Sequence, residues 1–120
     1  MICAWLPPAE RTAEMFKSVP QLLDTAGETC AKSKMQFCYH NHDFEFQQLN
    51  GGMPYDSILT SVNPEYVKME VDLYWIAKAG QDPVAYFQKY PGRFPLWHVQ
   101  DMDKDTGAFA EVGNGSIDFD

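Results

Sequence analysis

Six side chains that can bind a metal ion or transfer a proton stand where short apolar runs of this sequence end. They are imidazoles and carboxylates, at His40, His42, Glu70, Asp72, His98 and Asp101. Residues two apart in a β-strand project to the same face, so His40 pairs with His42, and Glu70 with Asp72. Two imidazoles and a carboxylate from neighbouring strands are a ligand set for a divalent metal with mixed nitrogen and oxygen donors. The residue types therefore predict a divalent-metal site.

Each of these residues also has a structural interpretation. A single histidine at a strand end is more often a hydrogen-bonded structural residue, and Asp72 and Asp101 are placed to cap the turns that follow them. All three histidines of the chain fall at predicted strand ends. This coincidence supports a functional role for them as strongly as the general tendency supports a structural one. Spacing leaves both open, because ligands on separate strands keep no fixed interval in sequence.

Strand-like and helix-like segments alternate along the chain and would bring these residues together. The apolar patterns predict strands at 1–6, 35–40, 67–72 and 94–99, and a further extended piece at 44–49. Helical spacing predicts helices at about 15–30, 54–62 and 83–90. Pro20 is expected to kink or restart the first helix, with Ser18 near the new N-terminus. A turn is expected at 50–52 and a polar loop at 100–111.

Strands separated by helices predict an α/β fold of parallel β-α-β units, in which ligands bind at the carboxyl ends of the strands. About four strands are expected in the 120 residues, whereas a (β/α)8 TIM barrel typically needs ~250 residues. We therefore expect residues 1–120 to form a partial TIM barrel, truncated at both ends. A small complete open α/β sheet fits the periodicity equally well.

Composition restricts the classes of partner. The net charge of -8 would repel a nucleic-acid backbone, so no nucleic-acid partner is expected. No apolar run approaches the ~20 residues of a membrane-spanning helix, so no membrane partner is expected either. The three cysteines, Cys3, Cys30 and Cys38, form no CxxC pair, which favours a reducing, cytoplasmic location.

Five blocks of the sequence, in the right order, resemble the sugar phosphate isomerase/epimerase family. They are Tyr39–Phe46 (YHNHDFEF), Met69–Trp75 (MEVDLYW), Ala79–Pro83 (AGQDP), Tyr90–Val99 (YPGRFPLWHV) and Val112–Phe119 (VGNGSIDF). The family belongs to the xylose-isomerase-like TIM-barrel superfamily, which also contains inosose dehydratases, ketose 3-epimerases and endonuclease IV. The acidic charge disfavours the DNA-repair activity of the last of these. The resemblance covers nearly the whole chain.

The resemblance implies one divalent metal, usually manganese, with zinc, cobalt or magnesium as alternatives. The family's ligands are usually a glutamate, an aspartate, a histidine and a second glutamate on successive strands. The aspartate position matches Asp72, the histidine position matches His98, and the first glutamate position matches His40. The final glutamate would lie beyond Asp120, and Gln100 stands where the family usually has lysine. His40, Asp72 and His98 are the predicted metal ligands.

The resemblance also implies a metal-dependent isomerase or epimerase of a sugar or sugar-like polyol. In that chemistry a base removes a proton next to a carbonyl or hydroxyl group that the metal polarises. His42, or the glutamate beyond the chain, is the predicted base, and Asp101 is predicted to orient His98. Glu70 and Trp75 are predicted to bind substrate, with core packing an equal alternative for Trp75.

The alternative function is a catalytically inactive barrel fragment or a carbohydrate-binding remnant. A half barrel leaves two sheet edges unpaired, so the chain is expected to be unstable or to form homo-oligomers through those edges.

Overall fold

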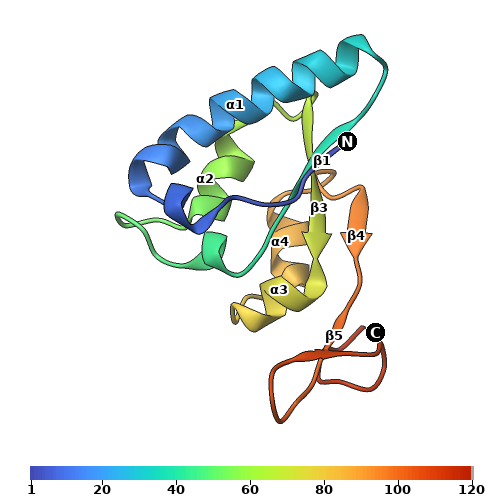
Figure 1. Ribbon diagram of the computed structural model, residues 1–120. Helices are drawn as coiled ribbons and strands as arrows, with labels where there is room; N and C mark the ends of the chain where they lie inside the picture. Colours follow the sequence, from blue (N-terminus) through green and yellow to red (C-terminus); the bar gives the residue numbers. More distant parts are fainter. Residues whose placement is uncertain (120) are drawn as a thin grey trace.

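The computed structural model describes residues 1–119, and its centre is a four-stranded parallel sheet of order β1-β2-β3-β4 (Figure 1). The strands are β1 (Ile2–Cys3), β2 (Phe37–His40), β3 (Val67–Asp72) and β4 (Leu96–His98). Helical segments connect each strand to the next, so the order of the strands in the sheet follows their order in the chain. The predicted α/β fold with about four parallel strands is confirmed.

The helices lie in the connections between these strands. They are η1 (Pro8–Glu10), α1 (Ala13–Lys32), η2 (Phe44–Phe46), α2 (Pro54–Ser61), α3 (Leu73–Lys78) and α4 (Pro83–Lys89). The start of α4 is as predicted, because the Asp82 side chain accepts a hydrogen bond from Val84 N and Pro83 takes the first helical position. Within residues 1–119 no helix has the length and apolar character needed to cross a membrane.

Helix α1 runs without a break through Pro20, so the predicted restart near Ser18 is wrong. Proline removes one backbone hydrogen bond inside a helix. Here the Pro20 ring is buried, together with Phe16, Val19 and Leu23 on the apolar side of α1. Packing of such a face contributes more to helix stability in a protein than local propensity does, which accounts for the continuous helix.

The extended piece predicted at 44–49 is also wrong, because residues 44–46 form the single turn η2. The Glu45 carboxylate folds back and accepts a hydrogen bond from His42 N at 2.8 Å, which closes the turn locally. The turn predicted at 50–52 is confirmed: Leu49 and Gly52 form a bridge, and Asn50 and Gly51 have positive φ.

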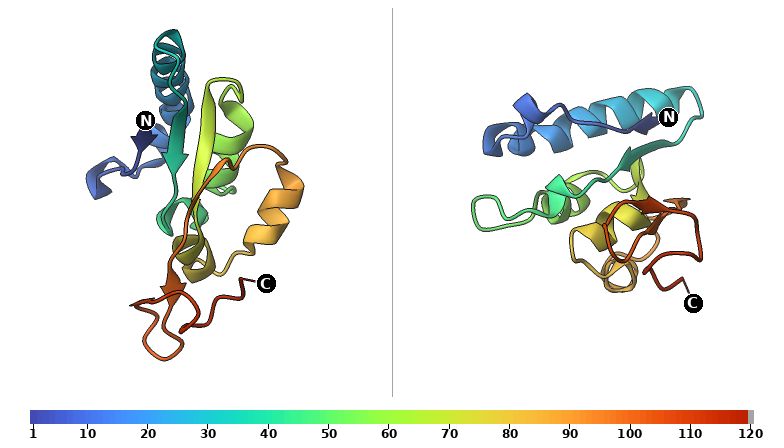
Figure 2. Two further views of the ribbon diagram at one scale, coloured as in Figure 1. Left: turned by 90° about the vertical axis from the view of Figure 1, so that its right-hand side faces the viewer. Right: turned by 60° about the horizontal axis from the view of Figure 1, so that its bottom comes forward.

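Alternation along β3 separates an apolar face from a polar one. Val67, Met69 and Val71 are fully buried, and α1 packs against β2, β3 and α2 on that side (Figure 2). Because successive side chains point to opposite faces, Glu70 and Asp72 project to the other face of the sheet.

The segment after β4 extends past the carboxyl end of the sheet (Figure 1). Part of the polar loop predicted at 100–111 is a small antiparallel pair, β5 (Asp101–Met102) and β6 (Phe109–Ala110). The Tyr74 hydroxyl of α3 donates to Gly107 O at 2.9 Å, which ties this segment to the body of the protein.

Candidate metal centre

Strand register brings the predicted ligands to one end of the sheet. His40 of β2 lies opposite Glu70 of β3, and Asp72, two residues further on, lies opposite His98 of β4. Each of the four side chains is therefore next to another at the carboxyl ends of three adjacent strands. This is the edge at which parallel α/β proteins bind ligands.

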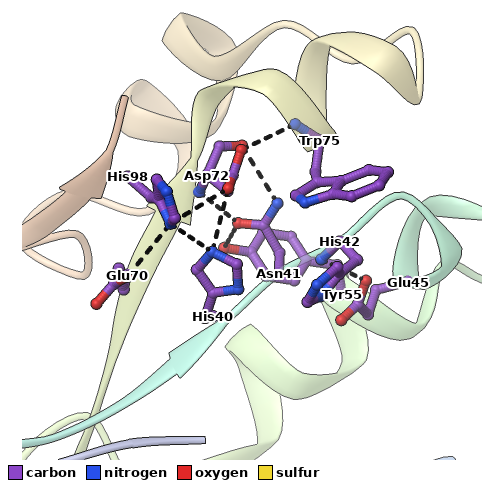
Figure 3. Close-up of polar contacts among 9 residues, drawn as sticks. All are labelled: His40, Asn41, His42, Glu45, Tyr55, Glu70, Asp72, Trp75 and His98. Carbon is purple, nitrogen blue, oxygen red and sulfur yellow. Dashed lines mark hydrogen bonds and ion pairs between the residues drawn. The ribbon is translucent and has the colours of Figure 1, made fainter. Parts of the chain in front are cut away.

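Three of the four side chains converge on one point (Figure 3). His40 Nε2 lies 3.1 Å from Asp72 Oδ2 and 3.2 Å from His98 Nδ1. His98 Nδ1 lies 3.5 Å from Asp72 Oδ2. Two ligand atoms that share a metal at about 2.0–2.2 Å stand about 2.8–3.1 Å apart in octahedral geometry and about 3.3–3.6 Å apart in tetrahedral geometry. The three atoms are thus spaced as the ligands of one divalent cation would be.

Glu70 supplies a second carboxylate beside this cluster. Its Oε1 lies 3.9 Å from His98 Nδ1, and one ligand atom each from His40, Glu70 and His98 lie within 4.8 Å of one another. Asp72 Oδ2 is closer to both imidazoles, so it is the better first oxygen ligand, with Glu70 in reach as a second. The substrate contact predicted for Glu70 stays a prediction.

Asp72 uses its two oxygens differently. Oδ1 accepts a hydrogen bond from Trp75 N at 3.0 Å and caps α3, whereas Oδ2 faces the imidazoles of His40 and His98. The side chain is only 1% exposed. The capping interpretation is therefore confirmed, and it leaves one oxygen available as a ligand.

His42, the predicted base, lies beside the cluster among aromatic rings. Its ring centroid is 5.0 Å from that of His40, 4.9 Å from Trp5 and 5.2 Å from Trp75, and it stacks on Phe44 at 5.7 Å. Burial, and after it the neighbouring His40, lowers the pKa of His42. Its Nδ1 is buried with no hydrogen-bond partner in the described part of the chain. A neutral imidazole of this kind can accept a proton.

Two tryptophans border His42. Trp75, predicted from the sequence to contact substrate, is half-buried and also packs against Tyr74 and Phe109, so its core-packing and substrate-facing interpretations are compatible. Trp5 is 53% exposed and was missed by the sequence analysis. It follows β1 at the carboxyl end of that strand, but it lies inside the strand expected at 1–6, and the strand-end criterion selected only imidazoles and carboxylates.

Asp101 lies in a different environment from Asp72. Its carboxylate accepts four backbone hydrogen bonds of 2.7–3.0 Å, from the N–H groups of Met102, Gly113, Gly115 and Ile117. Burial acts to raise the pKa of Asp101, but the four donors outweigh it and the pKa is lowered. These bonds all stay within residues 101–117, and the contact with His98 predicted for Asp101 is not among them.

Two fully buried polar residues beside the predicted ligands, Asn41 and Glu45, were not predicted from the sequence. Glu45 accepts hydrogen bonds from the Tyr39 hydroxyl and from His42 N, both at 2.8 Å. Burial raises the pKa of Glu45 to about 7. The position of Glu45 between Phe44 and Phe46 could have indicated its role. A carboxylate beside residues that are usually buried must either be exposed or have a specific partner.

Comparison with known proteins places this geometry in context. No family model matches the chain. An inosose dehydratase of Clostridium tetani is 25% identical over an alignment 125 positions long, which covers 90% of this chain and 41% of the relative. An inosose dehydratase of Lacticaseibacillus casei is 26% identical over an alignment 114 positions long, which covers 81% of this chain and 38% of the relative. The chain thus spans about two fifths of the length of the curated relatives that it matches.

Two solved structures have the same fold over most of the chain. Both are sugar phosphate isomerase/epimerase proteins of Parabacteroides distasonis. One superposes with a TM-score of 0.76 at 30% identity, covering 90% of this chain and 41% of its own, and the other with 0.77 at 28%, covering 89% and 42%. The chain is therefore similar, over about nine tenths of its length, to part of a sugar phosphate isomerase/epimerase, and its fold is that of a partial TIM barrel.

Proposed function

We propose that this chain carries the metal centre of an isomerase or epimerase that acts on a sugar or sugar-like polyol. The observation that carries the proposal is the convergence of His40 Nε2, Asp72 Oδ2 and His98 Nδ1, with no pair more than 3.5 Å apart. The similarity to sugar phosphate isomerase/epimerase proteins supports the substrate class. Because the chain spans 41% of such a neighbour, the activity of the whole protein is part of the proposal.

The proposed cofactor is a divalent metal, manganese in the first place and zinc, cobalt or magnesium otherwise. His40, Asp72 and His98 would hold it, and Glu70 is in reach to add an oxygen ligand. The two imidazoles suit zinc or cobalt better than magnesium, and the carboxylates suit manganese. A metal held by these residues would supply Lewis-acid polarisation of the sugar's carbonyl or hydroxyl group and positive charge beside the oxygen that becomes negative.

The proton transfer is assigned to His42. Its lowered pKa keeps the imidazole neutral near pH 7, in the form that accepts a proton from the carbon next to the carbonyl. Trp5 and Trp75, both against His42, would exclude water and pack on the apolar C–H face of a sugar. Glu70 is proposed to hold a substrate hydroxyl when it does not bind the metal.

A dehydratase is the second candidate, because the curated relatives are named inosose dehydratases. Both reactions begin with removal of a proton next to a carbonyl. Return of a proton to the neighbouring carbon gives an isomer, and return to the opposite face of the same carbon gives an epimer. Departure of hydroxide from the adjacent carbon gives the dehydrated product instead. The same residues of this chain would serve the first step of either. An inactive or carbohydrate-binding remnant would hold metal or sugar without any proton transfer.

The decisive experiment measures metal content by mass spectrometry after the purified chain is loaded with manganese or zinc and desalted. We expect close to one metal per chain in the wild type and loss of the metal in His98→Ala. Asp105→Ala is the matched control, since this carboxylate is exposed and lies in the turn between β5 and β6. Absence of metal from a folded wild-type chain would contradict the proposal.

Proton abstraction is tested separately by exchange of substrate C–H for deuterium in heavy water, using neutral and phosphorylated sugars and keto-polyols. We expect exchange in the metal-loaded wild type and its loss in His42→Asn with the metal retained. Metal binding without exchange in any sugar would favour the remnant.

We also propose a reducing, cytoplasmic location and self-association. The first is supported by Cys3, Cys30 and Cys38, all free thiols. The second is supported by the position of β1 and β4 at the edges of the described sheet. Light scattering during size-exclusion chromatography measures the association state, and a monodisperse monomer with cooperative unfolding would contradict self-association.

A further inference from the structure

One fully buried amide side chain connects the two strands that carry His40 and Asp72. Asn41 directly follows His40 at the end of β2 and has no exposed surface. Its Oδ1 accepts a hydrogen bond from Asp72 N at 3.0 Å, and its Nδ2 donates to Asp72 O at 3.4 Å (Figure 3). The two ends of a single side chain thus satisfy both backbone polar groups of Asp72.

These hydrogen bonds begin where the pairing of the strands ends. The β2–β3 register stops at His40 opposite Glu70, two residues before Asp72. An amide side chain has the same donor and acceptor as a peptide group. Asn41 therefore continues the β2–β3 pairing with its side chain after the backbone of β2 has left the sheet.

The other ligand needs no such connection. Pairing of β3 with β4 extends as far as Asp72 opposite His98, so backbone register alone sets the relation between those two residues. On the β2 side, the Tyr55 hydroxyl of α2 donates to Asn41 Oδ1 at 3.5 Å and is itself fully buried. The amide of Asn41 is thereby held from a third element.

We propose that Asn41 is a positioning residue of the metal centre, which fixes the separation of His40 and Asp72 before a metal binds. The inference rests on the proposed function, because it takes these two residues as metal ligands. Without Asn41 the ends of β2 and β3 are free to move apart, and the buried N–H of Asp72 loses its acceptor. Metal binding would then have to order the two strand ends as well, which lowers the affinity.

The test compares Asn41→Ala with Asn63→Ala in the full chain. Asn63 Oδ1 also accepts a backbone hydrogen bond, from Glu65 N at 2.9 Å, in the segment between α2 and the amino end of β3. Zinc affinity is measured by competition with a chromophoric chelator, coordination by the visible absorption of bound Co2+, and stability by thermal unfolding without metal. We expect Asn41→Ala to bind zinc about 10–100-fold more weakly, as for loss of an outer-shell partner, and to change the Co2+ spectrum. Asn63→Ala is expected to lower the thermal stability and to leave the zinc affinity and the Co2+ spectrum unchanged.

Hydrogen exchange gives a readout that needs no metal. The Asp72 amide should be protected in the wild type and in Asn63→Ala, and should exchange faster in Asn41→Ala relative to the Val71 amide. If Asn41→Ala does not fold, Tyr55→Phe takes its place, with a smaller loss of zinc affinity expected in the same direction.

The outcomes separate the two proposals. The positioning role is overturned, and the metal centre is not, if a folded Asn41→Ala binds zinc as tightly as the wild type and has an unchanged Co2+ spectrum. The same result in Tyr55→Phe counts in the same way if Asn41→Ala does not fold. A folded wild type that binds neither zinc nor Co2+ overturns the metal centre, and the positioning role with it.

Discussion

Asp72 and Asp101 are both fully buried carboxylates near the carboxyl end of the sheet, but they are satisfied in different ways. Asp101 accepts four backbone hydrogen bonds, so both of its oxygens are occupied by its own loop. Asp72 accepts one backbone hydrogen bond at Oδ1 and turns Oδ2 toward two imidazoles. Both positions matched the same sequence pattern, a carboxylate after an apolar run.

The difference shows how a structural carboxylate can be told from a chemical one. The Asp101 carboxylate, whose oxygens accept hydrogen bonds from four N–H groups, organises its loop. The loop packs so closely that a Cβ at Gly115 would collide with Asp101 Oδ1. A buried carboxylate such as Asp72, with one oxygen facing two imidazoles, keeps that oxygen available as a metal ligand. Glu45 is a third case: Tyr39 and His42 donate to its carboxylate, but burial outweighs the hydrogen bonds, and its pKa is raised where that of Asp101 is lowered.

The largest effect is expected for Asp72→Asn. Asparagine keeps an oxygen to cap α3 but replaces the anionic Oδ2, so metal affinity should fall by more than the roughly 100-fold typical of an outer-shell loss. Titration calorimetry with manganese or zinc measures it, and Asp101→Asn should stay within about threefold of wild type. Equal affinity in wild type and Asp72→Asn would assign the oxygen ligand to Glu70 instead.

Glu45 predicts a pH dependence of stability. With a folded pKa of about 7, above the ordinary value near 4.5, Glu45 keeps its proton in the folded state while the unfolded chain loses it. Its contribution to stability should therefore fall by about 2–3 kcal/mol between pH 4.5 and pH 7. The neutral amide introduced by Glu45→Gln imitates the protonated acid and should remove this slope.

Urea denaturation of wild type and Glu45→Gln across that pH range makes the measurement. The lowered pKa of His42 gives a slope of opposite sign at acidic pH, and it is common to both proteins, so their difference isolates Glu45. Parallel pH profiles would show that Glu45 is ionised in the fold.

Asp101→Ala should destabilise the protein without affecting the metal. Four backbone N–H groups would lose their acceptor, and we expect the Tm to fall by roughly 5–10 °C. Calorimetry of the metal-free chain measures the shift, with Asp105→Ala as the exposed control. A large loss of metal affinity at unchanged Tm would instead support the predicted contact with His98.

The smallest effect is expected for Asp82→Ala. Asp82 caps α4 as Asp72 caps α3, but no contact between Asp82 and an imidazole is found among the described residues, and a lost cap costs about 1 kcal/mol. Chemical denaturation should show this loss with metal affinity unchanged. A change in metal affinity would mean that capping and ligation cannot be separated in this fold.

Features of the fold that depend on one short segment could be predicted from the sequence. The Asp82-Pro83 helix start, the turn at Asn50-Gly51 and the limits of β3 all follow from neighbouring residues and agree with the structure. Pro20 and the 44–49 segment did not follow the local pattern. Burial against the sheet kept α1 continuous, and the Glu45 side chain closed a turn where alternation suggested a strand.

The sequence by itself determined the parallel α/β class and the strand ends at which His40, Asp72 and His98 stand, because alternation and turn residues act over a few positions. Only the tertiary structure decided which of these groups meet. Register sets His40 level with Glu70 and Asp72 level with His98, the side chain of Asn41 connects two strands past their last pairing, and Asp101 is enclosed by its own loop. Contacts between segments about 30 residues apart depend on packing and register, which no local pattern of residues records.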